Sequence, residues 1–399
     1  MEGLLRTAVP SDRSALRFVI LVGVMSFFAD FTYEGARSIT GPYLAILGAS
    51  GAVVGLVAGF GELAGYGLRL VSGRLADRTE KFWPIAITGY VVQMAAVPAL
   101  ALTGSWPAAA ALIVAERIGK AIRNPPRDVL LSHAGEQMGG IGWAFGVHEA
   151  LDQFGALFGP LLVALAFGAS LRYHFAFAVL LVPALATLSV LAVARRSYPQ
   201  PEHLAVHADE SSPGRMPKAF WIYLAGAALV AAGFADFALV AYHFQHAGTV
   251  RGASVPLFYA AAMGASGVGS LIFGRLFDRF GLVILVPLTV VTTAFAPLVF
   301  LGGTSAALAG CVLWGIGMGV HESIMPAAVA PLVSRAHRAS AYGLFTGVYG
   351  LAWFLGSTAI GFTYDRSVMG TVLLCVALQG LAVPFFVVAG RRVPRPVAS

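Results

Sequence analysis

The feature that most constrains this chain is a series of long apolar segments separated by short polar breaks. A helix needs about 20 apolar residues to cross the hydrocarbon core of a bilayer. Only 11% of the 399 residues are charged, whereas soluble domains carry about 25%. The sequence therefore predicts an all-α membrane protein and excludes a soluble domain, a disordered chain and a disulfide scaffold. The twelve predicted transmembrane helices are 17–42, 52–74, 82–104, 106–128, 140–166, 172–194, 219–244, 254–276, 282–302, 305–328, 339–362 and 368–390.

The longest polar stretch divides these spans into six and six. It is rich in proline and reads as a linker between two halves. We therefore expect an N-terminal six-helix bundle over 1–194, a cytoplasmic linker over 195–218 and a C-terminal six-helix bundle over 219–399. The first apolar stretch is too long for a signal peptide and contains Asp30 and Glu34, so it is expected to remain as a helix.

Basic residues are distributed unevenly about the predicted spans. If both termini are cytoplasmic, nineteen of the 26 lysines and arginines fall on the inner side, and only Arg172, Arg251 and Arg366 fall on the outer side. This is the positive-inside pattern of membrane proteins, which also explains the net charge of +7 without a nucleic-acid partner. With short loops and no organelle signal, the chain is expected in a bacterial inner membrane, with several spans and both termini in the cytoplasm.

The two halves repeat each other. The segment Phe28-Ala-Asp30-Phe recurs as Phe234-Ala-Asp236-Phe, and Gly73-Arg-Leu-Ala-Asp-Arg recurs as Gly274-Arg-Leu-Phe-Asp-Arg. Because each half has an even number of spans, both copies have the same orientation in the membrane. The sequence therefore predicts two pseudo-symmetric bundles related by an axis along the membrane normal.

The stretch from Gly73 to Lys81 resembles the G-x-L-x-D-R-x-G-R/K loop of the major facilitator superfamily, with Glu80 in place of the usual glycine. The chain resembles this family of secondary transporters over essentially its whole length. The resemblance implies alternating access of a central site to the two sides of the membrane, and it implies a gating role for this loop. The gating residues implied by the two copies are Gly73, Asp77, Arg78, Lys81, Gly274, Asp278 and Arg279.

Ionisable side chains recur inside the predicted spans, where each one costs at least a few kcal/mol. Asp30, Glu34 and Arg37 follow an i, i+4, i+7 spacing, which places them on one helical face. We therefore expect a polar cavity between the bundles rather than charges that face lipid. The candidate substrate-binding or proton-coupling residues are Asp30, Glu34, Arg37, Arg117, Lys120, Glu149, Asp152, Asp236, His243 and Glu322.

Two interpretations of these charges stay open. In the first, a carboxylate such as Asp30, Glu149 or Asp152 takes up and releases a proton as access alternates. In the second, neighbouring charges neutralise each other permanently. The pairs expected for the second interpretation are Glu34–Arg37, Glu116–Lys120 and Glu149–Arg117.

Two further motifs bear on the direction of transport. Arg117 matches the arginine of the fourth-helix motif of the family, and Gly155-x-x-x-Gly159 resembles the core of its fifth-helix antiporter motif. This favours exchange, although close packing of helices through small residues explains the same glycines. Pro125 and Pro126 are expected to end or bend the fourth helix.

Together these features predict a secondary active transporter, a proton-coupled exporter (antiporter) of a small polar, anionic or amphipathic metabolite or drug. The basic fourth span is the reason for expecting anionic or polar character. Alternatives are a proton symporter for uptake, transition-metal efflux through scattered histidines, and a membrane-embedded enzyme. Because no Walker, G-x-S-x-G or H-E-x-x-H motif occurs, we expect no enzymatic activity, cofactor or bound metal. The expected partners are a small-molecule substrate, protons and the lipid bilayer, with the chain as a monomer.

Overall fold

The computed structural model describes residues 12–79, 81–137, 141–170, 172–198, 216–333 and 338–391. All regular elements in these ranges are helices. Eleven helical segments of the described chain are long and apolar enough to cross a membrane. The remaining predicted span is α4 (Trp106–Gln137), whose middle is rich in charged residues. The predicted all-α architecture is therefore confirmed, while most of the predicted linker lies outside the described residues.

The first six spans form one bundle, in which α6 and α7 together make the sixth span. The other helices of this bundle are α1 (Asp12–Ile46), α2 (Gly51–Thr79), α3 (Phe82–Ala99), α5 (Ile141–Ser170), α6 (Tyr173–Val179) and α7 (Leu181–Ser197), with a 3₁₀ turn at Leu100–Leu102. A Cβ atom on Gly155 would lie 2.3 Å from the Phe27 carbonyl oxygen, and one on Gly159 would lie 2.2 Å from that of Phe31. The glycines therefore let α5 pack directly on the backbone of α1, which confirms the packing interpretation of this motif.

The last six spans form the second bundle, and several of them are interrupted. Its helices are α8 (Lys218–Gly233), α9 (Phe237–Ala247), α10 (Val255–Phe280), α11 (Leu285–Thr293), α12 (Phe295–Leu301), α13 (Thr304–Gly319), α14 (Met325–Ala327), α15 (Arg338–Tyr364) and α16 (Val368–Arg391). A π-helical segment, Val320–Ile324, separates α13 from α14. Short 3₁₀ turns lie at Gly252–Ser254, Gly281–Ile284 and Ala330–Leu332.

The seventh span is broken where one continuous helix was predicted. The backbone leaves the helical conformation after Gly233 and resumes it at Phe237, with Asp236 as the N-cap of α9. The Asp236 carboxylate accepts a hydrogen bond of 2.9 Å from the Ala238 amide, which satisfies one of the free N–H groups at the helix start. The break thus places a charged side chain in the middle of the span.

Of the two effects expected of the prolines, ending the fourth helix is ruled out, because α4 continues past them to Gln137. Pro125 has no N–H to donate to the carbonyl four residues earlier, that of Ala121. The Ser72 hydroxyl of α2 donates a hydrogen bond of 2.9 Å to this free carbonyl. A neighbouring helix therefore satisfies the group that proline leaves unpaired, and the helix can continue.

The residues expected in gating loops lie mainly within helices. The last turns of α2 contain Gly73 and Arg78, and the last turns of α10 contain Gly274 and Arg279. Lys81 lies directly before α3, and the side chains of Asp77 and Asp278 lie outside the described part of the chain. The loop placement is therefore wrong, because leucine, alanine and arginine favour continued helix here. The gating role itself stays a prediction.

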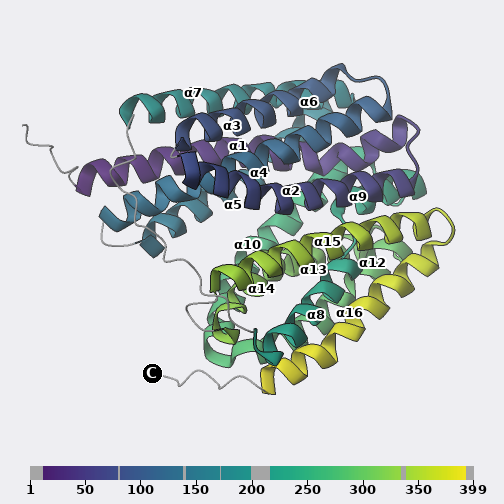
Figure 1. Ribbon diagram of the computed structural model, residues 1–399. Helices are drawn as coiled ribbons and strands as arrows, with labels where there is room; N and C mark the ends of the chain where they lie inside the picture. The colour runs from purple at the N-terminus through teal and green to yellow at the C-terminus, as the bar shows by residue number, and fades with distance from the viewer. Residues whose placement is uncertain are drawn as a thin grey trace, which may run out of the picture.

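The two bundles meet at one face of the molecule and diverge toward the other (Figure 1). We call the face where α1 begins and α16 ends the terminal face, and the other face the opposite face. Near the opposite face, a Cβ on Gly41 would lie 1.9 Å from the Ala238 carbonyl oxygen, and one on Gly55 would lie 2.3 Å from that of Ser357. The backbones of α1 and α9, and of α2 and α15, are therefore in direct contact, and the structure is closed at the opposite face.

The glycine contact between α1 and α5 can be tested with a pair of one-methyl changes on the same helix. Gly159→Ala places a methyl group against the α1 backbone, whereas Gly168→Ala places one where no atom lies within 4 Å. Both changes replace glycine with alanine within the same helix and so gain helix propensity. The difference in stability between the two variants therefore reports packing. We expect Gly159→Ala to be less stable by about 1–3 kcal/mol, measured as a lower apparent Tm in detergent. Equal melting temperatures of the two variants would contradict the packing argument.

Candidate functional site

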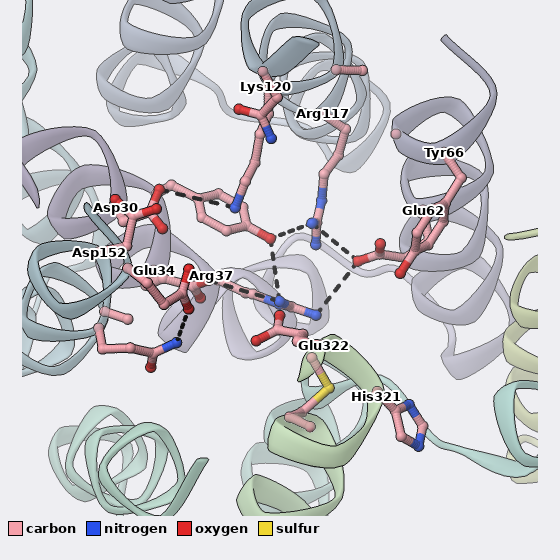
Figure 2. A pocket seen from close by; sticks show the side chains of 18 of the residues that line it. Asp30, Glu34, Arg37, Glu62, Tyr66, Arg117, Lys120, Asp152, His321 and Glu322 are labelled. Atoms are coloured by element: carbon pink, nitrogen blue, oxygen red, sulfur yellow. Dashed lines mark hydrogen bonds and ion pairs between the residues drawn. The ribbon is translucent and has the colours of Figure 1, made fainter. Parts of the chain in front are cut away.

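A cavity with a volume of about 500 Å³ lies between the two bundles (Figure 2). Its walls come from α1, α2, α4 and α5 on one side, and from α10, the π-helical segment and α15 on the other. Most of the predicted coupling residues therefore face this cavity instead of lipid. The predicted residues that line it are Asp30, Glu34, Arg37, Arg117, Lys120, Glu149, Asp152 and Glu322.

Asp30 is the centre of one charge cluster. Its Oδ1 atom lies 3.2 Å from Nη2 of Arg123 and 4.0 Å from Nζ of Lys120. The Arg123 side chain is fully buried and also donates to Gln93 Oε1 at 2.6 Å and to the Tyr90 hydroxyl at 2.9 Å. Each of the three nitrogens of this buried guanidinium thus donates to an acceptor, which offsets the cost of burying its charge.

A second charge cluster joins four helices and both bundles. Figure 2 shows the part of it formed by Arg37, Glu62 and Arg117. Nη2 of Arg37 lies 3.1 Å from Oδ2 of Asp236, across the interface between the bundles, and 3.6 Å from Oε1 of Glu62. The same Glu62 oxygen lies 3.0 Å from Nη1 of Arg117. The Tyr33 hydroxyl accepts hydrogen bonds from both arginines. Glu62 and Tyr33 thus bridge two positive charges that would otherwise repel each other.

Glu34 faces the second bundle. The Tyr259 hydroxyl of α10 donates a hydrogen bond to its carboxylate. Nη1 of Arg37 lies 4.0 Å from Glu34 Oε1, which confirms the predicted i, i+3 pair. The Tyr259–Glu34 hydrogen bond is therefore a second polar link between the two bundles at the depth of the cavity, in addition to the Arg37–Asp236 ion pair.

The other two predicted ion pairs are not formed. Glu116 accepts a hydrogen bond of 2.7 Å from Gln93 and lies 3.7 Å from Nε of Arg117. Lys120 instead reaches toward α1, where its Nζ lies 4.0 Å from the centre of the Tyr33 ring. The favourable spacing along α4 is therefore overruled by partners on neighbouring helices.

On α5, Glu149 accepts a hydrogen bond of 2.9 Å from Gln153 and has no cation partner in the described chain. Nδ1 of His148 lies 3.6 Å from Oδ2 of Asp152, and the ligand atoms of His148, Glu149 and Asp152 lie within 4.8 Å of one another. The other ring nitrogen of His148 is 2.7 Å from the Ser26 hydroxyl. Because Arg127 also donates to Ser26, at 3.3 Å, a positive charge already borders this group, and we assign no metal to it.

The second bundle contributes fewer charges. Glu322 lies in the π-helical segment, is exposed to the cavity, and makes no hydrogen bond or ion pair with the described residues. Its neighbour His321 is buried, with its ring centre 4.3 Å from that of Phe234 and 5.4 Å from that of Trp353. Single π-helical turns often occur at functional sites because they re-aim side chains; here one presents Glu322 to the cavity.

Two predicted site residues, His243 and Asp236, do not line the cavity, and His243 is the more distant in its contacts. Its Nδ1 atom lies 2.8 Å from the Tyr364 hydroxyl, and its ring packs against Phe300. Asp236, by contrast, forms an ion pair with Arg37, which does line the cavity. The position of His243 in α9, toward the opposite face, explains the difference.

Several cavity residues were missed by the sequence analysis, most clearly on α2. Glu62, Tyr66 and Arg69 line the cavity and share the i, i+4, i+7 spacing of Asp30, Glu34 and Arg37. That spacing could have identified them from the sequence, because it places the three side chains on one face of the helix, as in α1.

The bridging role of Glu62 predicts a loss of stability when its charge is removed. Glu62→Gln leaves Arg37 and Arg117 with one fewer carboxylate each, which we expect to cost about 1.5–3 kcal/mol. Glu149→Gln is the matched control, because Glu149 is exposed to the cavity and bonds only to a neutral side chain. The measurement is the apparent Tm of the two variants in the same detergent. A Glu62→Gln protein as stable as Glu149→Gln would show that Glu62 does not bridge the arginines.

The comparisons with known proteins agree with this architecture. The model of the Major Facilitator Superfamily matches residues 20–357. An uncharacterized protein of Mycobacterium tuberculosis is 42% identical over 395 residues, which cover 97% of this chain and 95% of the relative.

Two solved structures are similar in fold. One is a bacterial homolog of the human lysosomal transporter Spinster in an inward-facing, unoccupied conformation, with a TM-score of 0.73 and 14% identity over 95% of this chain and 97% of that one. The other is the nucleoside transporter NupG, with a TM-score of 0.72 and 13% identity over 94% of this chain and 100% of that one. The chain therefore belongs to the Major Facilitator Superfamily and is a multi-pass membrane transporter.

Proposed function

We propose that this transporter is a proton-coupled exporter, which exchanges protons for a small polar or amphipathic solute that carries a positively charged group. It works in a bacterial inner membrane, with the terminal face toward the cytoplasm, and acts as a monomer. The positive-inside distribution of lysine and arginine supports this orientation. The observation that carries the proposal is the Glu322 carboxylate, which has no partner among the described residues and faces the cavity.

Four of the five cations that line the cavity do not favour an anionic solute. Arg37, Arg117, Lys120 and Arg127 each have a carboxylate oxygen within 4.0 Å. Separating such a pair inside a protein costs several kcal/mol. The basic α4, which suggested an anionic substrate, is therefore already neutralised by the protein.

The unpartnered carboxylate supports exchange. A carboxylate inside a membrane protein is stabilised either by a bound proton or by a cation beside it. A proton on Glu322 and a cationic group of the solute would occupy the same carboxylate, so the binding of one displaces the other. Each half of the transport cycle then carries one of the two ligands, which is the property of an antiporter.

Everted vesicles with a preformed acid-inside gradient test this proposal. A panel of cationic, zwitterionic, anionic and neutral compounds is added to vesicles that contain the wild type, Glu322→Gln or Glu322→Asp. We expect a cationic or zwitterionic compound to dissipate the gradient with the wild type, more weakly with Glu322→Asp, and not with Glu322→Gln, because only a carboxylate can exchange the two ligands.

Two outcomes would contradict the proposal. Dissipation that is unchanged in Glu322→Gln would remove this carboxylate from coupling. A solute that accumulates in cells together with protons would identify the alternative, a proton symporter for uptake.

A further inference from the structure

Arg69 of α2 differs from the other cations that line the cavity. It has no carboxylate partner in the described chain, and its Nε atom is buried without a hydrogen-bond acceptor. The guanidinium carbon lies 5.6 Å from the centre of the Tyr66 ring, which also lines the cavity. Gly65 lines the cavity on the same helix, and a Cβ there would meet no atom within 4 Å. An arginine thus faces open space with unused donors.

We propose that Arg69 binds an anionic group, a carboxylate or a phosphate, of the same solute whose cationic group binds Glu322. The transported solute is then a dipolar ion. This inference rests on the proposed function, in which Glu322 binds the cationic group, and it adds the residue that binds the anionic group. Arginine suits the role because its planar donors match the oxygens of carboxylates and phosphates.

Charge balance supports a dipolar solute. Besides Glu149, which bonds to Gln153, the cavity-lining groups without an oppositely charged partner in the described chain include Arg69 on one bundle and Glu322 on the other. A ligand with both charges supplies a partner to each group and brings no net charge into the protein, so the desolvation penalty of an uncompensated charge does not arise. The Tyr66 ring beside Arg69 adds an apolar wall for the part of the ligand between its two charges.

The test uses purified protein in detergent, without a proton gradient, so that it measures binding alone. The probes are amino acids and aminoalkyl phosphates of graded length. Each is compared with its full ester (a carboxylate ester or a phosphate triester), which is cationic, and with its N-acetyl form, which is anionic. We expect one or more zwitterions to raise the Tm of the wild type, and their esters and N-acetyl forms to bind at least about tenfold more weakly.

Arg69→Gln should lower the affinity for the zwitterion about 10- to 100-fold and leave that for its ester unchanged. Arg69→Lys should still bind the zwitterion more tightly than its ester, but by a smaller factor than the wild type. Arg172→Gln is the matched control, because Arg172 is exposed and does not line the cavity. The inference is overturned if no zwitterion of the panel binds, or if Arg69→Gln binds zwitterions like the wild type. Loss of exchange in Glu322→Gln with unchanged ligand affinity in Arg69→Gln would overturn this inference and leave the proposed function intact.

A separate observation concerns the closed opposite face. The Asp365 carboxylate, at the connection between α15 and α16, accepts hydrogen bonds from the backbone amides of Gly51 at 2.7 Å and Ala52 at 2.8 Å. These amides begin α2, in the other bundle. Free N–H groups and the helix dipole make a helix start a favourable place for a carboxylate. The helix start of one bundle is therefore capped by the other bundle.

We infer that Asp365 is a latch that holds the opposite face closed. The two bundles cannot separate at this face without breaking both hydrogen bonds, since donor and acceptor belong to different bundles. Elsewhere at this face, closure depends on backbone packing, such as that of Gly55 on Ser357, and on a longer hydrogen bond of 3.4 Å that the Tyr173 hydroxyl of α6 donates to Gln245 of α9. The latch adds a polar contact that exists in only one of the two conformations and so biases their populations.

Spin labels are attached at Ile46→Cys and Met369→Cys, both exposed near the opposite face. Pulsed electron paramagnetic resonance then measures the distance between the labels, which increases when this face opens. Asp365→Ala and Asp365→Asn should increase the population with the longer distance about 2- to 30-fold. Ser50→Ala is the matched control, because Ser50 caps the same helix from within its own bundle, at 3.3 Å from the Val53 amide. A distance distribution of the Asp365 variants equal to that of Ser50→Ala overturns the inference, provided that both proteins melt at similar temperatures.

Discussion

The structure depends on the mutual neutralisation of charges between its two bundles. Arg37 is the central group, because it pairs with Asp236 across the interface and shares Glu62 with Arg117. A charge in the middle of a membrane is tolerated only where protein or water surrounds it. The network therefore forces these spans to turn their charged faces toward one another. This creates the polar cavity, fixes how α1, α2 and α4 face it, and ties α9 to them through Asp236.

Glycines and charged residues have different structural roles at different depths along the membrane normal. At the opposite face, small residues bring the backbones of α1 and α9 into contact, as at Gly41 and Ala238. Toward the terminal face the bundles diverge (Figure 1), and the cavity residues Glu322 and Arg69 have no oppositely charged partner in the described chain. A polar link that spans both bundles, such as Glu34 with Tyr259, must rearrange when the bundles rock, so it contributes differently to the two conformations.

Much of the fold followed from the sequence because lipid leaves few choices. Span length and the inward-facing charges of α1 both come from the cost of exposing polar groups to hydrocarbon. The details that failed depend on partners distant in sequence. Ser72 satisfies the carbonyl freed by Pro125 and lets α4 continue, and Lys120 turns toward Tyr33 of another helix instead of Glu116. Local spacing shows which residues share a face, but only tertiary packing decides which of them pair.

Sidedness of access to the cavity tests the account most directly. Ser270→Cys places a thiol in the cavity wall, and the native Cys311 and Cys375 are buried. Membrane-impermeant thiol reagents are applied to each side of oriented vesicles, with and without a pH gradient and a solute that dissipates it. The account predicts labelling from the side of the terminal face at rest, and labelling from the other side as well when a gradient drives turnover. Labelling from one side alone under every condition would contradict alternating access of this cavity.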